Sequence, residues 1–220
     1  MSSITLEIIY QDNHLLAIDK PAGIPTQDSG SGLDNLEDQA RQWVKEAAKK
    51  PGNVFLHAVH RLDRPVSGVV LFGRTTKALQ RLNLQQREKQ TRKVYLALLD
   101  RPPPKPSGTL THCLAHGSHR ALVSNKRQPD HKLSTLHYEV IRQHGPFCEV
   151  RILLETGRYH QIRAQFAHVG CPIVNDSQYG ATRASWPAHR IALHHSELEI
   201  IHPTLRSPLV LRSSQPDNPW

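Results

Sequence analysis

The segment CEVRILLETG, residues 148–157, indicates the class of fold, because apolar and polar residues alternate along it and a turn follows. Apolar residues occupy every second position from Cys148 to Leu154, whereas Glu149 and Arg151 lie between them. This period of two predicts a β-strand with one buried face. Thr156-Gly157 predicts a turn, and the helical spacing of residues 160–169 predicts a short helix that ends at Gly170.

Segments on both sides of this strand repeat the pattern of strands joined by short connections. Further strands are expected as a hairpin over 4–19 and at 69–72, 94–99, 109–114 and 134–141. Two further helices are expected at 34–50 and 75–88, the latter with Leu79, Leu82 and Leu84 facing inward. Because strands outnumber helices, the sequence predicts an α+β fold with a mixed, mainly antiparallel sheet and flanking helices.

The proline-rich segment RPPPKPSG, residues 101–108, is the clearest interruption along the chain. Its four prolines lack backbone donors and predict an extended connector. The segment could be a domain boundary, but a surface loop is the favoured interpretation. We therefore expect one domain over residues 1–220.

The charge balance indicates a polyanionic partner. The 220 residues contain 28 Lys and Arg against 19 Asp and Glu, a formal net charge of +9. Such a balance concentrates phosphate polymers near the protein but does not identify the polymer. The three cysteines form no CxxC pair, so neither a disulfide framework nor a zinc knuckle is indicated. Without a signal-like N-terminus or an apolar run of about 18 residues, the protein is expected to be cytoplasmic and to have no membrane span.

A second distinctive segment, HRLDRPVSG at residues 60–68, places Asp63 between Arg61 and Arg64. Taken alone, such a carboxylate is more often part of a surface ion pair, worth ~0 to 1 kcal/mol, than a reactive group. Tyr95 in an apolar strand is usually a core residue, and Arg163 on a short helix is usually a solvated charge. Each residue alone therefore favours a structural role.

Five segments occur in order along nearly the whole chain: IIYQDNHLLAIDKPAGIP, HRLDRPVSG, RKVYLAL, ETGRYHQIRAQFAHVGCPI with NDSQYG, and RIALHHSELEIIHP. Together they resemble the signature motifs of the RluA-type RNA pseudouridine synthases. The resemblance implies the catalytic fold of that family, without an appended N-terminal RNA-binding domain. Taken together, the motifs favour catalytic roles over structural ones.

The resemblance implies that uridine is isomerised: the C1′–N1 bond breaks, the uracil rotates, and C1′ is rejoined to C5. Because the uracil returns, no hydrolytic water is admitted, and the second carboxylate that glycosidases use is unnecessary. The resemblance assigns Asp63 to the ribose of a flipped-out uridine. It acts either as nucleophile at C1′ or as base at C2′, and the sequence leaves both routes open.

The resemblance also implies roles for residues around this acid. Arg163 would lie beside Asp63 and keep it charged, because a nearby cation favours the charged form of a carboxylate. Tyr95 would lie against the flipped uracil, where its ring stacks and its hydroxyl assists a proton transfer. Arg61 would fill the space left in the RNA stack. The expected substrate-binding residues are Arg61, Arg64 and Ile162.

Three positions depart from the family pattern. Val66 stands where the family usually has Thr, Asn175 where Gly is typical, and His195 where Ala is commoner. None of them is a proposed catalytic side chain. Asn175 is expected to alter its turn only slightly, because Asn tolerates left-handed backbone angles.

The expected partner is a compact stem-loop of ribosomal or transfer RNA, recognised by a monomer with no obligate protein partner and no membrane. No metal is expected, because His194 and His195 point in opposite directions on a strand. The isomerisation that the resemblance implies is expected to need no organic cofactor. Two other functions are compatible with the composition: a non-catalytic RNA-binding module and a carboxylate-dependent nucleoside hydrolase. The retained Asp63, Tyr95 and Arg163 argue against the first, and the lack of a motif-linked second carboxylate argues against the second.

Overall fold

The computed structural model describes residues 6–28, 30, 32–47, 49, 52–181 and 186–214. These described residues divide into two compact units, one formed by those within 6–91 and 195–214 and the other by those within 92–194. The proline-rich segment 101–108 is not the boundary, because it lies inside the second unit. The single domain expected over residues 1–220 stays a prediction.

The first unit contains a sheet with the strand order β1-β2-β4-β10, in which β3 pairs with β4 and β11 with β10. The strands are β1 (Glu7–Gln11), β2 (Leu15–Lys20), β3 (His57–Ala58), β4 (Ser67–Gly73), β10 (Leu193–Ile201) and β11 (Pro208–Arg212). The first hairpin is confirmed, although residues 4 and 5 lie outside the described residues. Strand β10 begins in the second unit and continues in the first from His195.

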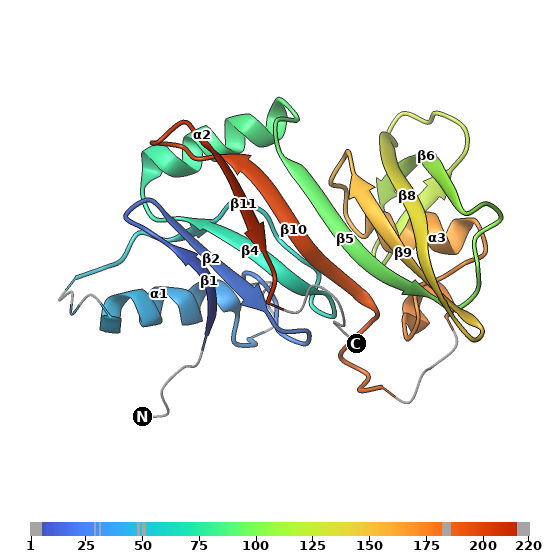
Figure 1. The fold of residues 1–220 in the computed structure, drawn as a ribbon, viewed down its shortest axis with the longest axis horizontal. Coiled ribbons are helices and arrows are strands. Elements are labelled where there is room, and N and C mark those ends of the chain that lie inside the picture. The colour runs from blue at the N-terminus through green and yellow to red at the C-terminus, as the bar shows by residue number, and fades with distance from the viewer. Residues whose placement is uncertain are drawn as a thin grey trace. The chain divides into compact units, whose positions relative to one another are not determined.

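Two helices belong to this unit, α1 (Leu36–Ala47) and α2 (Thr76–Arg87). Thr75 caps α2, because its hydroxyl accepts a hydrogen bond from the amide of Ala78. Leu82 is fully buried as expected, but Leu84 is 44% exposed, so its expected inward position is wrong. Residues 48, 50 and 51, at the expected end of the first helix, lie outside the described residues. Figure 1 shows α2 alongside the end of β10, where Gln85 bonds to the backbone of Ile201.

The second unit contains an antiparallel sheet with the order β5-β9-β8-β6-β7. The strands are β5 (Arg92–Leu99), β6 (Ser107–His116), β7 (Ala121–Ser124), β8 (Lys132–His144) and β9 (Phe147–Leu154). The apolar face predicted for β9 is confirmed, because Cys148, Val150, Ile152 and Leu154 are all buried. Glu149, expected on the opposite face, is also buried, and its carboxylate lies 3.1 Å from Nε2 of His144. Together, the units confirm the α+β fold with a mainly antiparallel sheet.

Helix α3 (Gln161–His168) packs against this second sheet. Figure 1 shows it behind β6 and β8, and the side-chain amide of Gln165 donates to backbone carbonyls of both strands. All residues from Gln161 to Phe166 are buried, so α3 has no solvated side over this stretch. The helix ends as expected at Gly170, whose φ of 83° is left-handed. A short 3-10 helix, η1 (Ser177–Tyr179), follows.

Candidate active site

Asp63 lies on the loop that connects β3 to β4, and the backbone on both sides of it is fixed. Thr26 holds Leu62, the residue before Asp63. The Thr26 hydroxyl donates to the carbonyl of Leu62 and accepts from its amide, both at 3.0 Å. The amide of Val66 donates to the carbonyl of Asp63 at 3.0 Å. Leu62 and Val66 are buried, whereas the Asp63 side chain is half-buried. The carboxylate is therefore mounted on a rigid loop and accessible.

The buried side chain of Lys20 joins this loop to the segment that follows β2. It is 0% exposed, and its ammonium donates to the carbonyls of Pro21 (3.0 Å), Ile24 (2.8 Å) and Arg64 (3.3 Å). A lysine ammonium has three donors, which matches this set of three acceptors. Arg64 adds a second connection, because its Nε donates to the carbonyl of Gly23 at 2.9 Å.

Lys20 also interacts with Asp63 through their opposite charges. The pKa of Lys20 is lowered from 10.5 to about 7, chiefly because burial disfavours the charged amine. The negative charge of Asp63 acts in the opposite direction and raises this pKa. The sequence did not predict this interaction, because the expected hairpin ends at residue 19 and Lys20 lies just beyond it.

A close backbone approach fixes the start of β4 directly after the Asp63 loop. Gly68 has a φ of 111°, and a Cβ at this position would lie 2.3 Å from the carbonyl oxygen of His195. His195 is fully buried, its Nδ1 lies 2.7 Å from the carbonyl oxygen of Val69, and its ring meets that of His60 edge-on at 5.3 Å. The motif residues His60 and Gly68 therefore hold the loop in place, and His195 packs against both.

In the second unit, Tyr95 lies on β5 opposite Ile152 of β9 and is 7% exposed. Lys93 lies two residues earlier and so shares its face of the strand. Burial lowers the pKa of Lys93 to about 8. An apolar strand therefore presents an aromatic ring and a partly desolvated amine on one face.

Arg163 is held on α3 by a buried ion pair. Its Nε and Nη2 donate to the two carboxylate oxygens of Asp176 at 2.7 and 2.9 Å, and Nη2 also donates to Gln178 at 2.7 Å. The side chains of Arg163 and Asp176 are only 4% and 1% exposed. The guanidinium lies 5.1 Å from the ring centroid of Tyr179. The usual interpretation of Arg163 as a solvated charge is therefore wrong, and Asp176 is a partner that the sequence analysis missed.

Asn175 explains one departure from the family pattern. Its φ of 67° is left-handed, as expected for a position where Gly is typical. Its side-chain amide donates to the carbonyls of Pro187 (3.1 Å) and Arg190 (2.6 Å). Asn therefore keeps the left-handed turn and adds two bonds that Gly could not make.

The structure distributes the expected site residues over both units. Asp63, Arg61 and Arg64 lie in the first unit, and Tyr95, Ile162 and Arg163 in the second. Arg61 and Arg64 are exposed, and Ile162 is 5% exposed. Their expected roles toward substrate stay predictions. Within the described ranges, no group of three or more His, Cys, Asp or Glu is placed to hold a metal ion, and no helix is long and apolar enough to cross a membrane.

Comparison with known proteins identifies the family. The model of the RNA pseudouridylate synthase family matches residues 14–168. The tRNA pseudouridine synthase C of Yersinia pestis is 32% identical over 235 residues, which cover 98% of this chain and 88% of that protein. The ribosomal large subunit pseudouridine synthase C of Buchnera aphidicola (subspecies Baizongia pistaciae) is 30% identical over 93% of this chain, which spans 65% of that protein.

A solved structure shows the same fold. The protein named human RNA pseudouridylate synthase domain containing 1 matches with a TM-score of 0.79 and 24% identity, over 100% of this chain and 87% of the other. The family match over residues 14–168 includes Asp63, Tyr95 and Arg163. This chain therefore belongs to the RluA-type family of RNA pseudouridine synthases.

Proposed function

We propose that this enzyme forms pseudouridine in structured ribosomal or transfer RNA, with Asp63 acting on the ribose of a flipped-out uridine. The observation that carries the proposal is the setting of Asp63. Its carboxylate is half-buried on a loop that is fixed on both sides, and the fully buried ammonium of Lys20 interacts with its charge. A surface ion pair needs neither the rigid mounting nor the buried cation.

The reaction needs an ionised carboxylate but consumes no water and no oxidant. The C1′–N1 bond breaks and the C1′–C5 bond forms, while C5 loses a proton and N1 gains one. Asp63 serves this reaction on either of two routes, as nucleophile at C1′ or as base toward the C2′ proton. The ammonium of Lys20 interacts with the negative charge of Asp63, which both routes require.

The other proposed site residues act on the base and on the RNA around it. Tyr95 stacks on the uracil and takes part in proton transfer through its hydroxyl. Arg163 supplies a fixed positive charge, for which the ion pair with Asp176 provides the rigid support. The remaining proposed substrate-binding residues are Arg61, which fills the gap in the stack, Arg64 and Ile162.

The names of the relatives and the charge of the chain support an RNA substrate. One relative is named for transfer RNA and another for the large ribosomal subunit, so the family motifs do not select between them. The net charge of +9 suits either polyanion. We propose a stem-loop of one of these RNAs as the partner, bound by a monomer in the cytoplasm.

The test is the replacement Asp63→Asn, which removes the charge and keeps the size of the side chain. Pseudouridine formation is expected to be abolished while folding and RNA binding persist, because only the reacting group has changed. The measurement is the release of tritium from RNA labelled at uridine C5, with the exposed Asp130→Asn as matched control. A folded Asp63→Asn protein that still releases tritium would refute the role of Asp63.

A further inference from the structure

Three aromatic rings form a stack in the second unit, beside the start of α3. The rings of His116 and Tyr159 lie 4.1 Å apart with an interplanar angle of 28°. The rings of Tyr159 and His160 lie 3.8 Å apart with an angle of 20°. We call these three rings the ring stack. Tyr159 forms its middle, and the exposed ring of His116, at the end of β6, forms its outer end.

The inner end of the ring stack is held firmly. His160 has a left-handed φ of 52°, a conformation that costs free energy for a residue with a Cβ. Its Nδ1 lies 3.1 Å from the hydroxyl of Tyr179, which also accepts from the amide of Ala121 at 2.8 Å. The same Tyr179 ring lies under the guanidinium of Arg163. The stack is therefore connected through Tyr179 to a residue with a proposed catalytic role.

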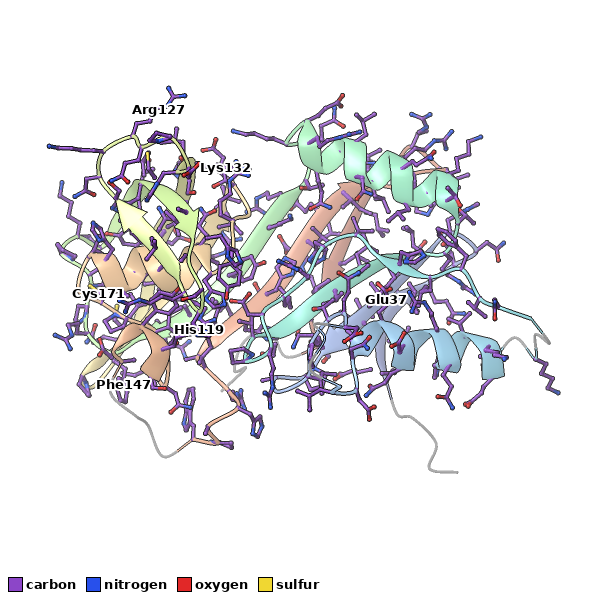
Figure 2. The ribbon with its side chains drawn as sticks, turned by 180° about the vertical axis from the view of Figure 1, so that it is seen from behind. Glu37, His119, Arg127, Lys132, Phe147 and Cys171 are labelled. Atoms are coloured by element: carbon purple, nitrogen blue, oxygen red, sulfur yellow. The ribbon has the colours of Figure 1, made fainter. Side chains whose placement is uncertain are left out.

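The turn between β6 and β7 lies beside the ring stack. Its residue His119, labelled in Figure 2, accepts hydrogen bonds at its carbonyl from the hydroxyl of Tyr159 (3.3 Å) and from the side-chain amide of Gln178. Gly117 is required in this turn, because a Cβ there would lie 2.4 Å from the carbonyl oxygen of Arg120. Arg120 in the turn and Arg158 next to Tyr159 are both exposed. Two cations therefore lie close in sequence to the stacked rings.

Stacked rings with neighbouring arginines are suited to unpaired nucleotides. Every base has a π-face that stacks on an aromatic side chain, and arginines bind the adjoining phosphates. To hold the turn between β6 and β7, Tyr159 needs only its hydroxyl, which bonds to the carbonyl of His119. The exposed ring of His116 is not needed for that bond, and it extends the stack toward solvent. Two of the five tyrosines of the chain contribute to this one region.

We propose that the ring stack is a platform on which an unpaired base of the RNA substrate stacks, on the outer face of His116, with Arg120 or Arg158 at its phosphate. The inference rests on the proposed function, because the nucleotide belongs to the RNA that is modified. It adds a contact outside the flipped uridine, in the same unit as Arg163.

The replacement His116→Ala removes the outer ring and is expected to weaken binding of a fluorescein-labelled ten-nucleotide oligoadenylate about tenfold. The slope of log Kd against log salt should stay unchanged, because stacking releases no counterions. His116→Phe should restore wild-type affinity, since it keeps a ring. Arg120→Ala and Arg158→Ala test the phosphate contact, and one of them should lower the slope by about one. His189→Ala, an exposed histidine of the same unit, is the control that should change nothing.

The proposal is overturned if His116→Ala binds as tightly as the wild type, if His116→Phe is as weak as His116→Ala, or if His116→Ala lowers the salt slope. Tritium release from uridine-labelled RNA separates this proposal from the proposed function. For a substrate RNA, His116→Ala should raise KM and leave kcat unchanged, and an unchanged KM would refute the platform alone. If the wild type releases no tritium while the oligoadenylate results hold, the proposed function fails and the platform stands as an RNA-binding site.

Discussion

Replacing Lys20 by Met tests the buried ammonium beside the Asp63 loop through the pH dependence of stability. Burial lowers the pKa of Lys20 to about 7 in the folded chain, whereas the unfolded chain keeps the ordinary value of 10.5. Between these values the unfolded chain binds a proton that the folded chain lacks. The free energy of unfolding of the wild type therefore gains a contribution that grows as the pH rises from about 7 to about 10.5.

The magnitude follows from the gap between the two pKa values. A gap of one pKa unit corresponds to about 1.4 kcal/mol, so the full gap corresponds to roughly 5 kcal/mol above pH 10.5. Over the experimentally convenient range from pH 6.5 to 9.5, the expected gain is about 3 kcal/mol. Lys20→Met lacks this contribution but keeps the other titrating groups. The difference between wild type and variant therefore isolates Lys20.

The assay is urea unfolding of both proteins at several pH values across this range. Lys77→Met, which removes an exposed lysine of α2, is the control and should show a difference from wild type that does not change with pH. The stability of the wild type relative to Lys20→Met should rise with pH. Parallel curves for wild type and Lys20→Met would mean that Lys20 keeps its ordinary pKa in the folded chain, and the reasoning on its burial would be wrong.

Two further replacements test single features of the site. Tyr95→Phe keeps the ring and removes the hydroxyl, so tritium release should slow while RNA affinity stays near that of the wild type; equal activity would exclude proton transfer by the hydroxyl. Gly68→Ala should destabilise the protein by about 3 kcal/mol or more in urea unfolding, because its Cβ meets the backbone of His195. Gly145→Ala is the control, since Gly145 also has a positive φ but has open space around it, and equal losses for the two variants would show that the contact with His195 is not the cause.

The sequence predicts well those parts of the fold that depend on local patterns. The apolar alternation in β9 and the end of α3 at Gly170 depend on neighbouring residues, and both appear in the structure. Strand β7 has four residues, of which only Ala121 is buried, so it carries no alternating pattern that could have predicted it. Leu84 was misplaced because the spacing of α2 does not by itself show that Gln85 takes a buried position, where it bonds to the end of β10.

The candidate site was predictable as a set of residues but not as a set of contacts. The ordered motifs point to Asp63, Tyr95 and Arg163, since each lies in a segment that resembles the family. The bond between Lys20 and the carbonyl of Arg64 joins residues 44 positions apart, and no local pattern predicts it. One signal was present: a lysine that closes an apolar strand and precedes Pro-Ala-Gly has its stem in the core, so its ammonium needs acceptors there.

A test of Arg163 needs a pair of replacements, because a single replacement also breaks the buried ion pair with Asp176. Arg163→Met alone leaves Asp176, which is 1% exposed, without the cation that binds both its oxygens. Breaking a buried pair from one side costs about 3–5 kcal/mol, so lost activity could reflect lost folding. Combining Arg163→Met with Asp176→Leu removes both charges, and such apolar replacement of a buried pair is often neutral.

The double variant Arg163→Met with Asp176→Leu separates support from chemistry. In urea unfolding it should be clearly more stable than Arg163→Met alone, because no carboxylate is left buried without its partner. In the tritium assay it should stay inactive, because the proposed reaction requires the guanidinium itself. Asp176→Leu alone should be destabilised, since it leaves the buried guanidinium without its carboxylate. An active, stable double variant would limit Arg163 to a structural role and remove it from the proposed mechanism.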